Sequence, residues 1–260
     1  MTVEIRGCDW RDPERGFASF GMVDHLLADP PFTPRVHANC RSNAGRTRGG
    51  KVDLTFGALT PEERDELCAR ASVCVRRFII IHTDLESVGA WQEAMEAHNI
   101  EYLRCGLWLK QGAMPQTTGD RPGSSAEAIV IGHATRNGKP MRKRWNGGGG
   151  FVEYRIPVPH RKGRHPTEKP VPLLERLLDD FTDHGETIAD THLGSGTSLV
   201  AAIRRGRHGV GWERIDKWVG EARKRTAASR EQFSFIDPKQ ERARSVATQV
   251  SLLDAQSEGK

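Results

Sequence analysis

Residues 23–32 read Val-Asp-His-Leu-Leu-Ala-Asp-Pro-Pro-Phe, an apolar run that stops at an acid followed by two prolines. Pro30 and Pro31 fix φ twice and donate no backbone N–H, so a strand over this run has to end at Asp29. In an open α/β sheet, ligands bind at the edge formed by the carboxyl ends of the strands. The run therefore predicts a functional acid at that edge. The alternative is a solvated Asp in a proline-stiffened loop.

A second stretch, residues 187–213, has the pattern of a nucleotide-binding βαβ unit. Residues 187–190 are strand-like, residues 193–197 read Leu-Gly-Ser-Gly-Thr, and the helix that follows leads to a strand ending in Glu213. Glycines permit close backbone approach to a ligand, and an acid one βα unit later suits a ribose. The loop has neither the Gly-Lys-Ser/Thr of a P-loop nor the third glycine of the dinucleotide fingerprint, so it contains no recognised phosphate-binding motif.

The rest of the chain alternates between predicted strands and helices. Residues 60–63, Thr-Pro-Glu-Glu, combine an N-cap, a proline at N1 and a capping-box acid. After Pro170, leucines and Phe181 recur at helical spacing and predict a face against the sheet. This alternation predicts an α/β domain over residues 1–228 and a polar tail over 229–260. The predicted strands are 2–6, 77–82, 100–110, 126–132, 152–156, 187–190 and 210–213, besides the run before Asp29, and the predicted helices are 60–73, 87–98, 198–205 and the one with Leu174, Leu177, Leu178 and Phe181.

The composition excludes several classes of protein. At 260 residues the chain suits one large domain, and its formal net charge of +5 favours a polyanionic partner. The five cysteines are odd in number and have no zinc-ligand spacing, so we expect no disulfide framework and no metal. No apolar run approaches the roughly 20 residues that span a bilayer. The expected location is a reducing cytoplasm.

Four sequence blocks together resemble one enzyme family. Asp29-Pro30-Pro31-Phe32 resembles the Asp/Asn/Ser-Pro-Pro-Tyr/Phe signature of S-adenosylmethionine-dependent DNA amino methyltransferases. Residues 165–170, His-Pro-Thr-Glu-Lys-Pro, resemble the family's His-Pro-Thr-Gln-Lys-Pro element. Residues 190–197, Asp-Thr-His-Leu-Gly-Ser-Gly-Thr, resemble its Asp-Pro-Phe-x-Gly-Ser-Gly-Thr loop, and residues 7–10 resemble its Gly-Asp block.

The order of these blocks is itself informative. Asp29 precedes the glycine loop, whereas in protein-glutamine and many RNA amino methyltransferases the loop comes first. This permuted order resembles the beta group of DNA amino methyltransferases. The resemblance implies a Rossmann-like, seven-stranded, mostly parallel sheet of the S-adenosylmethionine-methyltransferase type. It also implies an enzyme in the cytoplasm of a bacterial or phage-like host, associated with the nucleoid.

The resemblance also implies a role for each matched residue. Asp29 and the Pro30 carbonyl would accept the amino hydrogens of a flipped adenine, and Phe32 would stack on the base. Methyl transfer would then be a direct displacement, without a metal or a covalent enzyme intermediate. The implied catalytic residues are Asp29, Pro30, Pro31 and Phe32, and the implied cofactor-binding residues are Asp9 and Trp10 (cofactor adenine), Glu213 (ribose), Thr167 and Lys169 (methionine carboxylate), Asp29, His165, Asp190, His192, Gly194, Ser195, Gly196 and Thr197.

Three positions depart from the family pattern. Thr191 and His192 replace the usual Pro and Phe, and Glu168 replaces the commoner Gln. These departures keep open a protein of this fold that binds DNA without transferring methyl groups. A second alternative is transfer to cytosine N4. The acid at the head of the Pro-Pro motif favours adenine N6, because the family's cytosine enzymes usually have Ser there.

Duplex DNA is the expected partner. Residues 33–51 are basic without an apolar period and predict a loop that closes on phosphates. Residues 135–150 are basic, end in four consecutive glycines and predict a recognition segment. A homodimer is possible. Residues 249–253 resemble peptides that bind bacterial sliding clamps through Gln249, Leu252 and Leu253. The predicted DNA-binding residues are Arg35, Arg41, Arg46, Arg48, Lys51, Lys139, Arg142, Lys143, Arg144 and Trp145.

Overall fold

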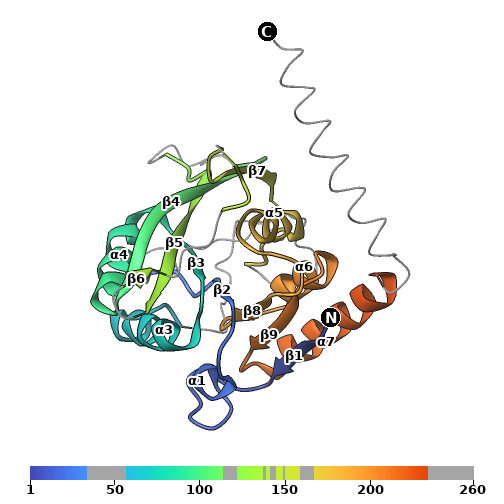
Figure 1. The fold of residues 1–260 in the computed structure, drawn as a ribbon. Coiled ribbons are helices and arrows are strands. Elements are labelled where there is room, and N and C mark those ends of the chain that lie inside the picture. The colour runs from blue at the N-terminus through green and yellow to red at the C-terminus, as the bar shows by residue number, and fades with distance from the viewer. Residues whose placement is uncertain are drawn as a thin grey trace.

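The computed structural model describes residues 1–33, 57–113, 122–136, 139–140, 145–148, 150–158 and 167–233, which form one sheet with helices on both faces (Figure 1). Its strands are β1 (Val3–Arg6), β2 (His25–Ala28), β3 (Phe78–Thr83), β4 (Ile100–Gln111), β5 (Ala126–Arg136), β6 (Lys139–Pro140), β7 (Glu153–Pro157), β8 (Thr187–Asp190) and β9 (His208–Trp212). Its helices are α1 (Phe17–Phe20), α3 (Pro61–Cys74), the short 3-10 helix η1 (Leu85–Ser87), α4 (Val88–Ala97), α5 (Val171–Phe181), α6 (Thr197–Arg204) and α7 (Asp216–Phe233).

The strand order confirms the predicted α/β class. The strands follow the order β1-β9-β8-β2-β3-β5-β4-β7, with β6 paired to β5. Neighbours are parallel except where β5 pairs with β3, β4 and β6. The expected count of seven strands is too low, because the described residues form nine. β7 extends the sheet beyond the 12-residue β4, and β6 is a two-residue hairpin arm that no periodicity could have revealed.

Strand β2 lies in the middle of the sheet, between β8 and β3 (Figure 1). All four of its residues are buried, because helices cover both faces. Leu26 and Ala28 join the core cluster beneath α3 and α4, whereas Leu27 joins the cluster with α5. The leucine stripe predicted after Pro170 lies in that second cluster, which confirms its orientation. As predicted, β2 ends just before Asp29.

The parallel strands place their carboxyl ends at one edge of the sheet, here called the carboxyl edge. Ala28 of β2 pairs with Ile81 of β3, and Asp190 of β8 pairs with Gly211 of β9. Because β5 is antiparallel to β3 and β4, β4 ends and β5 begins at this same edge. The acid after β2, the glycine loop after β8 and the acid after β9 therefore converge.

The predicted recognition segment, residues 135–150, begins and ends away from the carboxyl edge. β5 ends beside the start of β3, where His133 pairs with Phe78. The Trp145 ring packs 6.2 Å from that of Phe181, at the end of α5, and the Asn146 N–H donates to Asp180 O at 2.8 Å. The Trp145 ring is partly buried against the core cluster that contains Phe181, and the role of Trp145 in binding DNA stays a prediction.

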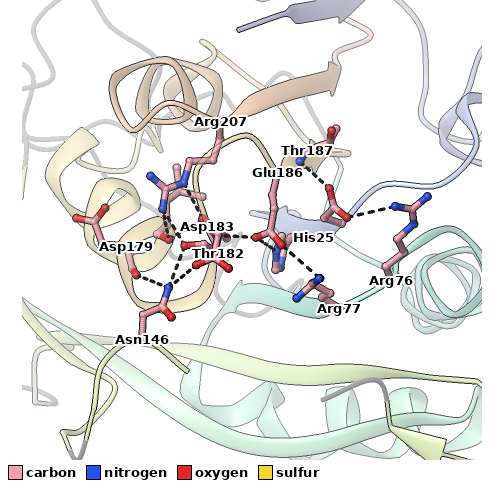
Figure 2. A network of polar contacts seen from close by, with 12 residues as sticks. His25, Arg76, Arg77, Asn146, Asp179, Thr182, Asp183, Glu186, Thr187 and Arg207 are labelled. Carbon is pink, nitrogen blue, oxygen red and sulfur yellow. Dashed lines mark hydrogen bonds and ion pairs between the residues drawn. The ribbon is translucent and has the colours of Figure 1, made fainter. Parts of the chain in front are cut away.

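Figure 2 shows the polar network that fixes this opposite edge, here called the amino edge. The Asn146 side chain donates to Asp179 O, Thr182 O and Asp183 Oδ1 at 3.1–3.3 Å. At the start of β2, the buried His25 ring bonds Glu186 at 2.9 Å. Residue 146 is thus anchored beside the starts of β2 and β8, across the sheet from Asp29.

The end of the chain is described only in part. The predicted domain boundary at residue 228 falls inside α7, which continues to Phe233 and buries Ser229. The remainder of the predicted tail lies outside the described residues, as do Gln249, Leu252 and Leu253 of the predicted clamp motif. Among the helices that the structure describes, none is long and apolar enough to cross a membrane.

Candidate active site

A cavity of about 460 Å³ opens at the carboxyl edge. It joins Asp29 after β2, the glycine loop after β8 and Glu213 after β9. Its size is within the range of small-molecule and cofactor sites. Of the predicted catalytic and cofactor residues, those that line it are Asp9, Trp10, Asp29, Pro30, Pro31, Phe32, Thr167, Lys169, Asp190, His192, Gly194, Ser195, Thr197 and Glu213.

The glycine loop requires its glycines. Gly194 and Gly196 have φ values of +52° and +83°, a backbone conformation that residues other than glycine rarely adopt. A Cβ on Gly196 would lie 2.8 Å from the Cβ of Ala222, so this glycine also allows α7 to pack against the start of α6. Gly196 does not line the cavity but shapes the loop that does.

Two acids hold the loop in place. Glu213 accepts the Gly194 N–H at 2.9 Å and the Ile215 N–H at 2.8 Å, and burial raises its pKa. Asp190 accepts the His192 N–H at 2.9 Å and the Ser198 hydroxyl, and burial raises its pKa to about 7. Both acids thus order the loop, and Glu213 keeps a position on the cavity wall.

An aromatic pair forms one wall of the cavity. The rings of Trp10 and His192 lie 5.9 Å apart and are tilted by 52°. Burial lowers the pKa of His192 to about 3, so its imidazole is neutral at physiological pH. Its Nδ1 is hydrogen-bonded to the Thr191 hydroxyl at 3.0 Å. The two departures from the family pattern therefore supply an uncharged flat ring where the family usually has Phe.

Replacing His192 by Phe is expected to weaken the pH dependence of stability while preserving the wall. The folded pKa of about 3 lies below the ordinary value of 6.5, so unfolded chains bind more protons between these values. Stability from this group is complete above about pH 6.5 and is lost as the pH falls toward 3. Thermal unfolding at pH 7.5 and 5 should show a smaller fall in Tm for His192→Phe than for the parent. An equal fall would contradict this assignment.

Asp9 lies on the cavity wall but is already paired. Its carboxylate accepts two hydrogen bonds at 2.9 Å from the Arg11 guanidinium, and this pairing lowers its pKa. Arg11 also donates to Glu63 at 2.7 Å. Sequence reasoning missed Arg11 and Glu63 as cavity residues, because they lie 52 positions apart and Glu63 was recognised only as the capping-box acid of α3.

Lys169 contacts Asp29 directly. Its Nζ lies 2.8 Å from Asp29 Oδ1 and 3.2 Å from Glu127 Oε2. Lys110 pairs with the other Glu127 oxygen at 2.7 Å. The implied role of Lys169 as a ligand of the methionine carboxylate stays a prediction, and its ammonium already contacts two carboxylates. Burial raises the pKa of Asp29, and Lys169 opposes that rise.

Glu168 is explained by a residue that the sequence did not reveal. Its carboxylate pairs with the Arg225 guanidinium of α7 at 3.2 Å and accepts the Ser195 hydroxyl at 3.0 Å. Arg225 also donates to Ser195 O at 2.9 Å. The acid in place of the family's Gln is therefore matched by a cation, and the pair ties α7 to the glycine loop.

Several predicted residues are not placed. His165 and the basic residues Arg35, Arg41, Arg46, Arg48, Lys51, Arg142, Lys143 and Arg144 lie outside the described residues, and only the backbone of Lys139 is described. Within the described ranges, no group of three His, Cys, Asp or Glu side chains is arranged to hold a metal ion.

A family model described as DNA methylase (N6_N4_Mtase) matches residues 76–224, which is more than half of the chain. The chain belongs to this family. The matched region runs from just before β3 into α7 and includes Lys169 and the glycine loop. It begins after Asp29, so the Asp-Pro-Pro-Phe motif is assigned by its place in the fold and its own sequence.

Individual relatives agree with the family assignment. The type II methyltransferase M2.DpnII of Streptococcus pneumoniae is 38% identical over 95 residues, which are 36% of this chain. The match spans about a third (34%) of that relative's length. Among solved structures, the M1.HpyAVI complex with S-adenosylmethionine has a TM-score of 0.65 at 18% identity, over 86% of this chain and 100% of that one.

A cytosine-N4-specific enzyme shares the same fold. The PvuII DNA methyltransferase has a TM-score of 0.64 at 12% identity, over 92% of this chain and 88% of that one. At such identities the likeness shows the fold alone, which is that of S-adenosylmethionine-dependent methyltransferases. This confirms the predicted fold class.

Proposed function

We propose that this chain transfers a methyl group from S-adenosylmethionine to N6 of adenine in duplex DNA. The observation that carries the proposal is one cavity containing both Asp29, with its Pro-Pro-Phe segment, and the glycine loop of residues 193–197. These two parts of the cavity follow β2 and β8, which pair in the sheet. Asp24, just before β2, and Thr187, at the start of β8, are hydrogen-bonded although they are 163 residues apart in sequence. The family assignment supports the same chemistry.

The cavity has the groups that this methyl donor needs. The left-handed glycines would let the loop backbone approach a ligand closely, and Glu213, directly after β9 on the cavity wall, would bind the ribose hydroxyls. Trp10 and the neutral His192 offer flat apolar faces for an adenine ring. Thr167 and Lys169 stay in our proposal as polar contacts for the methionine part, because both line the cavity.

The target base would enter from the other side of the cavity. Asp29 Oδ1 faces Lys169, whereas its Oδ2 has no partner among the described residues. Oδ2 and the Pro30 carbonyl would accept the two amino hydrogens and aim the nitrogen lone pair toward the methyl group. Phe32 would stack on the flipped ring.

S-adenosylmethionine supplies an electrophilic methyl group, so no covalent enzyme intermediate is needed. The chain contributes orientation of the amine and electrostatic support, because the ionised Asp29 stabilises the positive charge that develops on nitrogen. The Asp29 side chain is 24% exposed, and its partial burial strengthens that interaction.

Cytosine N4 is the second candidate target. The likeness to the cytosine-N4-specific PvuII enzyme favours it at the level of the fold. The acid at the head of the Pro-Pro motif favours adenine, since the resembling cytosine enzymes usually have Ser. A third possibility, a DNA-binding protein without transfer activity, rests on the departures at Thr191 and His192, for which the cavity gives a physical explanation.

Nucleoside analysis distinguishes these candidates. Purified chain is incubated with S-adenosylmethionine carrying a labelled methyl group and with mixed-sequence duplex DNA, which is then digested and analysed by mass spectrometry. We expect the label in N6-methyladenine. Label only in N4-methylcytosine would select the second candidate, and cofactor binding without labelled DNA would select the third. Label only in RNA or protein substrates would sink the proposal.

Contact with DNA through residues 33–51 remains a proposal, because most of that segment lies outside the described residues. Its flanks support the proposal: Thr33 bonds Asp84 near the end of β3, and residues 57–60 line the cavity. A homodimer and a sliding-clamp contact also remain predictions.

A further inference from the structure

Four side chains form an alternating chain of charges beside the cavity, here called the ion-pair chain: Asp29, Lys169, Glu127 and Lys110. They come from four separate segments, namely the end of β2, the block before α5, the start of β5 and the end of β4. The successive N–O distances are 2.8, 3.2 and 2.7 Å. The exposed fractions of the Lys169 and Glu127 side chains are 7% and 10%, so these two charges have little access to solvent.

We propose that Glu127 is a positioning residue for methyl transfer, which holds the Lys169 ammonium against one oxygen of Asp29 and leaves the other oxygen for the target amine. This inference rests on the proposed function and extends it to a residue outside every predicted motif.

The geometry explains why Glu127 is needed. Lys169 has a flexible four-carbon stem, and a single carboxylate would fix only one contact of its ammonium. The second contact, an ion pair with Glu127 Oε2 at 3.2 Å, holds the ammonium between two carboxylates and so restricts where Lys169 meets Asp29 Oδ1. The ammonium also lies 5.1 Å from the centre of the Phe32 ring, so its position affects both groups assigned to the target base.

The charges around Asp29 balance only when Glu127 is included. The ion-pair chain contains two carboxylates and two ammonium groups. On β3, burial lowers the pKa of His82 to about 3, so its ring is neutral, and in the described part of the chain neither ring nitrogen has a hydrogen-bond partner. Asp190, after β8, is a buried acid whose pKa burial raises to about 7. Without Glu127, Lys169 and Lys110 would face Asp29 alone, and a buried unpaired charge is costly.

The test uses Glu127→Gln in the full chain, which removes the charge and keeps the size of the side chain. We expect kcat for DNA methylation to fall about ten- to a hundredfold, as for a misplaced catalytic group, with cofactor Kd within about twofold of the parent. The acidic limb of the kcat–pH profile should move to lower pH, because Glu127 raises the pKa of Asp29.

Lys110→Met gives the opposite shift. Lys110 lowers the pKa of Asp29, so removing its charge should move the acidic limb to higher pH. Lys110 lies at the outer end of the ion-pair chain and is 19% exposed, so this variant decides the question if Glu127→Gln does not fold. Glu153→Gln on β7 is the control, because this exposed acid pairs only with Arg155 in the described contacts. This variant should change neither kcat nor the pH of the acidic limb.

Shifts of the acidic limb of the kcat–pH profile in opposite directions in Glu127→Gln and Lys110→Met support the positioning role. A purely structural role would lower the folded fraction of each variant without moving its acidic limb. An unchanged kcat and limb in Glu127→Gln, or an unmoved limb in a folded Lys110→Met, would overturn it. Failure of the proposed function is a separate outcome, because the parent chain would then not methylate DNA at all.

Discussion

Asp29→Ala is expected to reduce methyl transfer by about a thousandfold or more, while cofactor Kd stays within about twofold of the parent value. Asp29 Oδ2 is the acceptor assigned to the target amine, and removal of one such transition-state contact typically costs a hundred- to a thousandfold in rate. The change also removes the carboxylate that contacts Lys169 at 2.8 Å, which adds to the loss. Single-turnover transfer measures the rate, and calorimetry measures cofactor affinity.

Asp29→Asn is the matched variant. It keeps the shape of the side chain and one carbonyl oxygen, but it removes the charge that supports a positive amine. It should transfer more slowly than the parent and bind cofactor normally. If Asp29→Ala and Asp29→Asn both lost cofactor affinity as strongly as activity, Asp29 would belong to the cofactor half of the cavity.

Gly194→Val is expected to have the reverse effect and to weaken cofactor binding first. Gly194 has a φ of +52°, a conformation that costs other residues about 1–2 kcal/mol and β-branched residues more. Its N–H donates to Glu213 at 2.9 Å, so distortion of the loop also displaces the acid assigned to the ribose. We expect cofactor Kd to rise at least about a hundredfold, measured by calorimetry.

Gly185→Val supplies the control for backbone strain. Gly185 has a φ of +82° in the turn before β8, with open space around its Cβ position, and it lies at the amino edge. Gly185→Val should lower Tm about as much as Gly194→Val does and leave cofactor Kd unchanged. Equal loss of affinity in both variants would attribute the Gly194 effect to general destabilisation.

The sequence predicted those parts of the site that are encoded locally. Two prolines end β2 before Asp29, and left-handed backbone requires Gly194 and Gly196, so each can be recognised from a few neighbouring residues. The capping box at Thr60 likewise predicted the start of α3, which has both reciprocal hydrogen bonds. The alternation of strands and helices predicted the α/β class, but it predicted neither the order of the strands nor the antiparallel direction of β5.

The parts that sequence did not predict depend on contacts between distant segments. Arg225 follows two exposed basic residues on α7, and nothing local distinguishes it from Arg223 and Lys224. Glu127 did carry a signal, because it is a charged residue in an otherwise apolar strand that continues Ala-Ile-Val-Ile. Its contact with Lys169 could not be inferred, because the two residues lie in segments far apart in the sequence.

The central position of β2 has a consequence for how the chain folds. Strand β2, which leads to Asp29, is synthesised early, but its neighbour β8 begins only at Thr187, so one edge of β2 lacks its partner until then. Pairing of segments so far apart in sequence closes a long loop, which slows folding and exposes strand edges to aggregation. The cavity cannot close until β9 has emerged, because Glu213 follows that strand. A nascent chain of this protein thus lacks a complete cavity until Glu213 has been made.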